Sequence, residues 1–142
     1  YEIGSHNAIG LAGLGAGVGW VLDRGVADIR AHDERLCGLF LELTDGAEHL
    51  TVYGPRKLDE RAGVFSVNVA GMDPRELAAV LETDFGVLTR PGVHCAPLAH
   101  RTIGTHPTGT CRLSFGPFTT EDHVRHATGA LVKIAERAAV GR

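Results

Sequence analysis

The sequence predicts an α+β fold, in which about four mainly antiparallel strands form a sheet covered by helices and follow a long helical segment. Three observations support this prediction: two helical patterns open the chain, short strand-like runs follow, and further helical patterns are interleaved with those runs. The 142 residues suffice for one hydrophobic core. The hydrophobic fraction of 44% and the charged fraction of 22% are typical of a soluble globular protein.

The start of the chain predicts a capped helix. Ser5 or Asn7 can cap a helix over residues 8–23, which has one apolar face and a second stripe of glycines. Close packing explains these glycines better than ligand contact, because no GxGxxG spacing occurs and no strand precedes the run. We expect residues 1–25 to form a leading turn and glycine-rich helix, and residues 26–142 to form a small α+β domain.

The next elements are a helix, a strand and a loop. Helical periodicity over residues 26–43 contains Cys37, which we interpret as a small buried apolar residue. Residues 50–53 form a short strand candidate that Gly54 ends. The polar residues 56–62 predict a surface loop whose charges face solvent.

The middle of the chain predicts a strand followed by a helix. Residues 64–69 alternate apolar and polar side chains, which indicates a half-buried strand. Asp73, Pro74 and Glu76 then provide an N-cap, an N1 proline and an N3 glutamate for a helix. A further strand is expected over residues 87–90.

A last strand and helix complete the predicted fold. In the strand over residues 110–115, alternation places Cys111 on the core face and Arg112 on the opposite, polar face. Thr119 with Asp122 is expected to open the final helix, whose apolar residues keep a helical spacing.

Composition excludes several classes of function. A formal charge of −3 offers no basic field for nucleic acid, and the apolar run over residues 9–22 is too short and too rich in glycine to span a membrane. Three cysteines form an odd set, which favours free thiols in a reducing compartment, by default the cytoplasm. Residue 1 is Tyr and the only methionine is Met72, so we expect a piece of a longer chain.

The segment RPGVHCAPLAH, residues 90–100, is the strongest candidate for chemistry. Cys95 lies among residues that favour a turn or loop, which are Pro91, Gly92 and Pro97. Arg90 and a protonated His94 can lower the pKa of a thiol and so activate it as a nucleophile, and His94 and His100 can support the loop. The alternative interpretation is a small buried residue, which these loop-forming neighbours disfavour.

Arg112 is the second candidate, because an arginine fork binds a carboxylate or phosphate in two places. An ordinary surface ion pair is its alternative interpretation. Zinc ligation is disfavoured because the potential ligands form no CxxC pair; these are His94, Cys95, His100, His106 and Cys111. A cysteine protease is disfavoured because no oxyanion element or protease signature accompanies Cys95.

These motifs resemble the C-terminal part of class V, fold-type I pyridoxal-phosphate enzymes, within the cysteine desulfurase and selenocysteine lyase group. The similar segments are YEIGSHNAIGLAGLGAG, YGPRK, GVFSVNVAG, DPRELAAVLE, RPGVHCAPLAH and GTCRLSFGPFTTEDHV. Because they follow the family's order, the resemblance covers nearly the whole chain.

The resemblance implies roles for five residues. Cys95 would take sulfur from L-cysteine or a related amino acid and become a persulfide, Arg112 would bind the substrate carboxylate, and Arg90 would support loop or substrate. Ser5 stands where the family has threonine, and would reach the cofactor phosphate of the partner subunit in a homodimer, while Asn7 matches an asparagine of the same turn. A sulfur-acceptor protein is a further expected partner.

The resemblance also implies that part of the site lies elsewhere. The lysine that anchors pyridoxal 5′-phosphate belongs to a large domain upstream, and neither Lys57 nor Lys133 matches its motif. The chain alone is therefore expected to be inactive. A class V aminotransferase or another lyase without persulfide chemistry, and a non-catalytic α+β interaction module, remain the alternative functions.

Overall fold

The computed structural model describes residues 4–140. Their contacts form two compact units, of which the first ends at His32 and the second begins at Asp33. The units are described separately below. The predicted division between residues 25 and 26 separates an entry helix from a small α+β domain rather than two groups of contacts. It stays a prediction.

The first unit contains helix α1, Ala8–Arg24, one residue longer than expected. Asn7 caps it, because its side-chain oxygen accepts the N–H of Gly10 at 2.9 Å. Ser5, the other predicted cap, is exposed, and its neighbours at residues 1–3 lie outside the described residues. A Cβ atom at Gly13 or Gly17 would meet no atom of this unit within 4 Å, so the packing partner expected for the glycine stripe stays a prediction.

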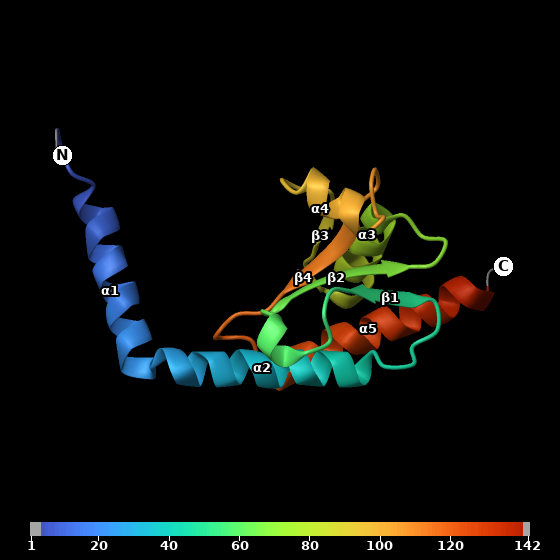
Figure 1. The fold of residues 1–142 in the computed structure, drawn as a ribbon, viewed down its shortest axis with the longest axis horizontal. Helices are drawn as coiled ribbons and strands as arrows, with labels where there is room; N and C mark the ends of the chain where they lie inside the picture. Colours follow the sequence, from blue (N-terminus) through green and yellow to red (C-terminus); the bar gives the residue numbers. More distant parts are fainter. Residues whose placement is uncertain (1–3, 141–142) are drawn as a thin grey trace. The chain divides into compact units, whose positions relative to one another are not determined.

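The second unit is the α+β domain that the sequence predicts, with a four-stranded antiparallel sheet in the order β1-β2-β4-β3 (Figure 1). Helix α2 leads into it from the first unit. In chain order the elements are α2 (Val26–Leu43), β1 (Leu50–Tyr53), the 3₁₀ helix η1 (Leu58–Glu60), β2 (Val64–Val69), α3 (Pro74–Phe85), β3 (Arg90–Gly92), α4 (Pro97–Thr102), β4 (Thr110–Ser114) and α5 (Glu121–Val140).

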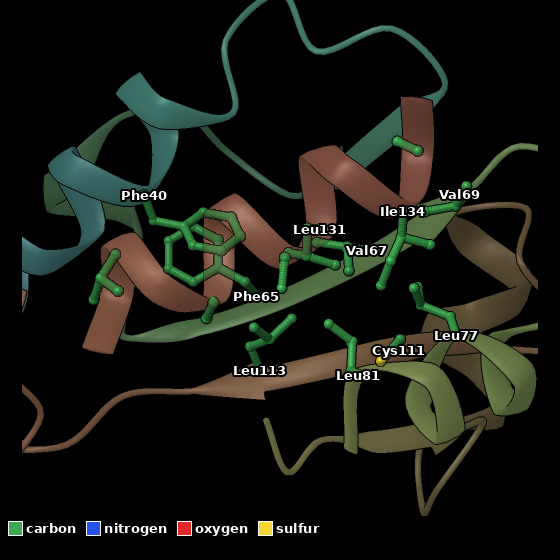
Figure 2. Close-up of a cluster of buried hydrophobic side chains, with 14 of the residues drawn as sticks. Phe40, Phe65, Val67, Val69, Leu77, Leu81, Cys111, Leu113, Leu131 and Ile134 are labelled. Carbon is green, nitrogen blue, oxygen red and sulfur yellow. The ribbon is translucent and has the colours of Figure 1, made fainter. Parts of the chain in front are cut away.

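One face of the sheet builds the core. Phe65, Val67 and Val69 of β2 are buried, as their alternation predicts, and they pack against side chains of α2, α3 and α5. Phe40 stacks on Phe65 with ring centroids 4.0 Å apart. Figure 2 shows the Cys111 sulfur among these apolar side chains, which confirms its predicted core position.

The other face of the sheet is polar, and four of its residues stand in one register row across all four strands. Tyr53 pairs with Ser66, Ser66 with Arg112, and Arg112 with Arg90. We call Tyr53, Ser66, Arg112 and Arg90 the arginine row. The helical core lies on the opposite face, so Arg112 faces away from the core as the strand pattern predicts.

The strand before Cys95 lies later in the chain than expected. The prediction placed it at residues 87–90, whereas β3 spans Arg90–Gly92. Residues after α3 complete its cap instead: Gly86 is left-handed and the Val87 N–H donates to the Leu81 carbonyl at 2.9 Å. Pro91 is tolerated in β3 because this is an edge strand, where one side of the backbone needs no ladder partner.

The loop over residues 56–62 was predicted as a solvated surface, and this is wrong for Arg61. Its side chain is 8% exposed, it donates to the carbonyl oxygens of Tyr53 and Pro55, and its guanidinium lies 4.4 Å from the Phe65 ring centroid. Burial lowers the Arg61 pKa from its ordinary value. Arg61 therefore closes the loop over the core, and a charge pattern alone does not distinguish this role from exposure.

Two further local features differ from the expectation. Helix α4, with Pro97 in its first turn, lies where a loop was expected. The final helix begins at Glu121 rather than at Thr119, because the Thr120 hydroxyl accepts the N–H of His123 at 3.2 Å.

Candidate functional site

Cys95 lies in a turn between β3 and α4, and it is the exposed member of the three free cysteines. We call residues 93–109, which connect β3 to β4, the Cys95 segment. Its first turn passes through His94, whose positive φ of 54° is uncommon for a residue with a side chain. The thiol is thus presented to solvent rather than packed into the core.

The two ends of the Cys95 segment touch each other. Gly92, the last residue of β3, and Gly109, the last residue of the segment, approach so closely that a Cβ atom on Gly109 would collide with the Gly92 carbonyl group. Gly109 also has a φ of 84°, where a side chain is strained. Asn68 of β2 donates from Nδ2 to the Gly109 carbonyl at 3.2 Å, so the base of the segment is joined to the sheet.

A buried pair holds the far part of the segment. His100 is 6% exposed, and its Nδ1 lies 2.7 Å from the hydroxyl of Thr105, which is equally buried. The His100 carbonyl also accepts the N–H groups of Thr105 at 2.8 Å and His106 at 3.2 Å. These bonds tie the end of α4 to the chain that returns to β4.

His94 braces the near part of the segment. Its Nε2 lies 3.1 Å from the carbonyl oxygens of both Arg90 and Pro91, and since carbonyls only accept, Nε2 carries a proton. Partial burial and then the charges of Arg90 and Arg112 lower the His94 pKa below its ordinary 6.5. A lowered pKa favours the neutral imidazole, so the activation of Cys95 by a protonated His94 gains no support from this direction and stays a prediction.

Arg90 and Arg112 form a cross-strand pair of like charges. They are directly opposite in the register, and among residues 4–140 neither has a carboxylate partner. Like charges directly opposite in a sheet are destabilising, so an anion that binds both relieves the repulsion. The Arg112 Nε is buried without a hydrogen-bond partner, and the Arg90 side chain is exposed.

The other two thiols are unsuited to nucleophilic chemistry. Cys37 and Cys111 are fully buried, which confirms the interpretation of Cys37 as a core residue. Burial raises the pKa of the Cys111 thiol, although its hydrogen bond with Thr89, at 3.1 Å, partly opposes this. Exposure thus separates Cys95 from the remaining cysteines.

The two lysines of the chain lie in other environments than Cys95. Lys57 pairs with Glu60 at 3.2 Å at the start of η1, and Lys133 is exposed on α5, which packs on the core face. The Asn7 side chain is engaged in capping α1. Chemically, an exposed thiol and a pair of arginines are suited to nucleophilic attack and to anion binding.

Residues 4–140 contain neither a cluster suited to a metal ion nor a helix suited to span a membrane. No cluster of three or more His, Cys, Asp or Glu side chains is close enough to hold a metal ion. Within the same range, no helix has both the length and the apolar character needed to cross a membrane.

Sequence reasoning missed three residues that shape the site. Asn68 was noticed only as a polar position in an alternating strand, Thr105 lay between the predicted elements, and Gly109 was quoted within a motif without a role of its own. Their roles depend on contacts between residues far apart in the chain. The one local signal was Gly109 itself, immediately before a strand that begins with a buried threonine.

The known proteins to which this chain is similar in sequence include several cysteine desulfurases. The chain is 32% identical to a probable cysteine desulfurase of Halalkalibacterium halodurans and 31% identical to a cysteine desulfurase of Pectobacterium atrosepticum. The alignments include 96% and 94% of this chain, but only 32% and 31% of the two relatives. The chain therefore spans less than half the length of the curated relatives that it matches.

Solved structures show the same similarity. The apo cysteine desulfurase of Thermococcus onnurineus superposes with a TM-score of 0.87 at 32% identity, over 95% of this chain and 33% of that one. The Escherichia coli cysteine desulfurase CsdA, at 23% identity and a TM-score of 0.80, shares the fold. The sequence profile of the aminotransferase class-V family matches residues 1–126. The chain belongs to the aminotransferase class-V family.

Proposed function

We propose that the whole protein is a pyridoxal-phosphate-dependent cysteine desulfurase, in which Cys95 accepts the sulfur of L-cysteine and Arg112 binds the substrate carboxylate. One observation carries this proposal: an exposed thiol stands in the turn that directly follows β3, whose Arg90 forms a cross-strand arginine pair with no carboxylate partner among residues 4–140. Both arginines contribute to the lowered pKa of His94, the residue before Cys95. His94 therefore lies within the electrostatic field of Arg90 and Arg112. The named relatives agree with this chemistry.

The proposed step at Cys95 is balanced without an added oxidant. The Cys95 thiolate attacks the sulfur of the substrate, an S–S bond forms, and the C–S bond of the substrate breaks. The electron pair of the broken bond stays with carbon, which takes up a proton and becomes the methyl group of alanine. Cys95 is left as a persulfide in an exposed turn, where a sulfur-acceptor protein can reach it.

Binding of the carboxylate orients the substrate for this attack. Arg112 stands on a central strand, so the sheet fixes its position, while Arg90 adds a second charge from the edge strand. A carboxylate bound between them offsets their repulsion and leaves the substrate side chain free to approach Cys95.

The cofactor would be held mainly outside this chain. When bound, pyridoxal 5′-phosphate supplies an electron sink for chemistry at the substrate α-carbon. We propose that its anchoring lysine is not in these 142 residues, that Ser5 and Asn7 contribute to the phosphate site of a partner subunit in a homodimer, and that the chain alone is inactive.

The test uses the whole protein that carries this chain, supplied with L-cysteine, and measures alanine and sulfide. Cys95→Ala should lower alanine formation by roughly a hundredfold or more, because the sulfur has no acceptor thiol. Cys111→Ala is the matched control, since it removes a buried thiol and should leave most of the rate.

Two outcomes would favour the other functions. Full desulfuration by Cys95→Ala, with a new amino acid formed from a keto acid, would indicate a class V aminotransferase or another lyase in which the thiol is incidental. A whole protein that transforms neither cysteine nor other amino acids would indicate a non-catalytic interaction module.

A further inference from the structure

Two buried side-chain atoms without a hydrogen-bond partner lie on the polar face of the sheet. They are Asn68 Oδ1, an acceptor, and Arg112 Nε, a donor. A buried polar group without a partner costs free energy because it has left water without replacing the lost bond. A complementary pair of such atoms on one surface therefore needs an explanation.

The register places the two residues on adjacent strands, one step apart. Ser66 is directly opposite Arg112, and Asn68 follows Ser66 by two residues on the same face of β2. Diagonal neighbours of this kind are within reach of long side chains. Rotation about the side-chain bonds of Arg112 can therefore turn Nε towards the Asn68 amide.

The orientation of the Asn68 amide is already set. Its Nδ2 donates to the Gly109 carbonyl at 3.2 Å and lies 3.5 Å from the Tyr53 hydroxyl. Because both contacts use the amide nitrogen, Oδ1 remains available as an acceptor. On the neighbouring strand, the Arg112 Nε–H is a buried donor that likewise has no partner.

We propose that Asn68 is a positioning residue for Arg112: its Oδ1 accepts the Arg112 Nε–H when the guanidinium is turned for ligand binding. This proposal rests on the proposed function of Arg112 as the carboxylate site. With Nε held by Asn68, the two terminal nitrogens, Nη1 and Nη2, face the ligand together. A carboxylate is then bound end-on, by one hydrogen bond from each terminal nitrogen.

The same residue links the two halves of the site. Asn68 bonds the base of the Cys95 segment through Gly109 and, in this proposal, the carboxylate-binding group through Arg112. One amide would thus set the distance between the substrate carboxylate and the thiol. Its donor side and its acceptor side can be separated by substitution.

Asn68→Leu removes both functions of the amide but keeps the branched shape and the number of side-chain heavy atoms, so no space is opened for water. Asn68→Asp keeps an acceptor for Arg112 Nε but cannot donate to Gly109. Ser66→Ala is the matched control, since Ser66 is directly opposite Arg112 on the same face and no hydrogen bond of its hydroxyl is found among the described residues.

The direct measurement is the ¹H–¹⁵N NMR signal of Arg112 Nε–Hε in the whole protein that carries this chain, with acetate added as an unreactive carboxylate and the signal assigned by its loss in Arg112→Lys. We expect solvent exchange of this proton to be roughly tenfold faster in Asn68→Leu, close to the original in Asn68→Asp, and unchanged in Ser66→Ala. A signal that is the same in the original chain and in Asn68→Leu would overturn the proposal. This readout needs a bound carboxylate but no turnover, so it stands or falls independently of the proposed reaction.

Kinetics of the whole protein then separate positioning from a merely structural role. Asn68→Leu should raise KM for L-cysteine about tenfold. The exchange measurement and the Asp variant then show whether Asn68 changes KM through its contact with Arg112. If Arg112→Ala leaves KM unchanged, the proposed function fails while the Nε–Hε result is unaffected. If the Leu and Asp variants accelerate Nε–Hε exchange equally, Asn68 acts only through Gly109 and the proposal is wrong.

Discussion

Arg112 and Cys95 belong to one candidate site but are held in opposite ways. Arg112 stands on β4, an inner strand paired on both sides, so backbone hydrogen bonds fix its position. Cys95 is exposed in a turn, and its segment is fixed by a glycine contact at the base and a few side-chain bonds. The comparison indicates a division of labour: the sheet positions the charge that binds, and the segment presents the atom that reacts.

The largest effect is expected at the base of the Cys95 segment. Gly109→Ala places a Cβ atom against the Gly92 carbonyl at a φ of 84°, so we expect a loss of about 2 kcal/mol or more in the free energy of unfolding, measured by urea denaturation. Gly104→Ala is the control, because Gly104 has a φ of 75° but open space around it, and should lose only about 1 kcal/mol. Equal losses would show that the contact with Gly92 contributes nothing.

A smaller effect is expected from the buried bond within the segment. Thr105→Val leaves His100 Nδ1 buried without its partner, which should cost about 1–2 kcal/mol and increase the rate at which a thiol reagent modifies Cys95. Thr102→Val removes an exposed hydroxyl from the same segment and should change neither quantity appreciably. Cys95 labelling that does not respond to Thr105→Val would mean that this bond does not hold the thiol's segment.

The smallest effect concerns pH. The His94 pKa is lower in the folded chain than its ordinary 6.5, so between these two values the unfolded chain binds more protons. The contribution of His94 to stability is therefore present above about pH 6.5 and is lost as the pH falls through the folded-state pKa. His94→Asn, which suits the left-handed backbone, should make the decline in unfolding free energy below about pH 6.5 shallower, as measured by urea denaturation across that range. A steeper decline in the variant would contradict the assigned direction.

The same contrast explains how much could be predicted from the sequence. The Asp73 cap, the alternation in β2 and the two faces of β4 depend on neighbours in the chain, and each was predicted correctly. The edge strand β3 was placed too early for two reasons. The residues after Gly86 complete the C-cap of α3, and Pro91 fits into a strand only because β3 lies at the edge of the sheet, which the sequence alone does not reveal. Local rules thus identified Cys95 and Arg112 as candidates but not what holds them.

What holds the site depends on contacts across the sheet. The bond from Asn68 to Gly109 joins residues 41 apart, and the burial of Arg61 depends on the ring of Phe65 and on carbonyls of another loop. No periodicity or motif in the sequence encodes such pairings. The roles of the site residues themselves remain proposals that chemistry must test.

The most direct test is to trap the sulfur. The whole protein, incubated with L-cysteine and then alkylated and digested, should carry one additional sulfur atom on the peptide that contains Cys95, and none on the peptides that contain Cys37 or Cys111. The additional sulfur should be absent in Cys95→Ala and much reduced in Arg112→Ala at low substrate concentration, because the carboxylate is no longer held. Sulfur release as rapid as in the original protein without any persulfide on Cys95 would contradict the central claim.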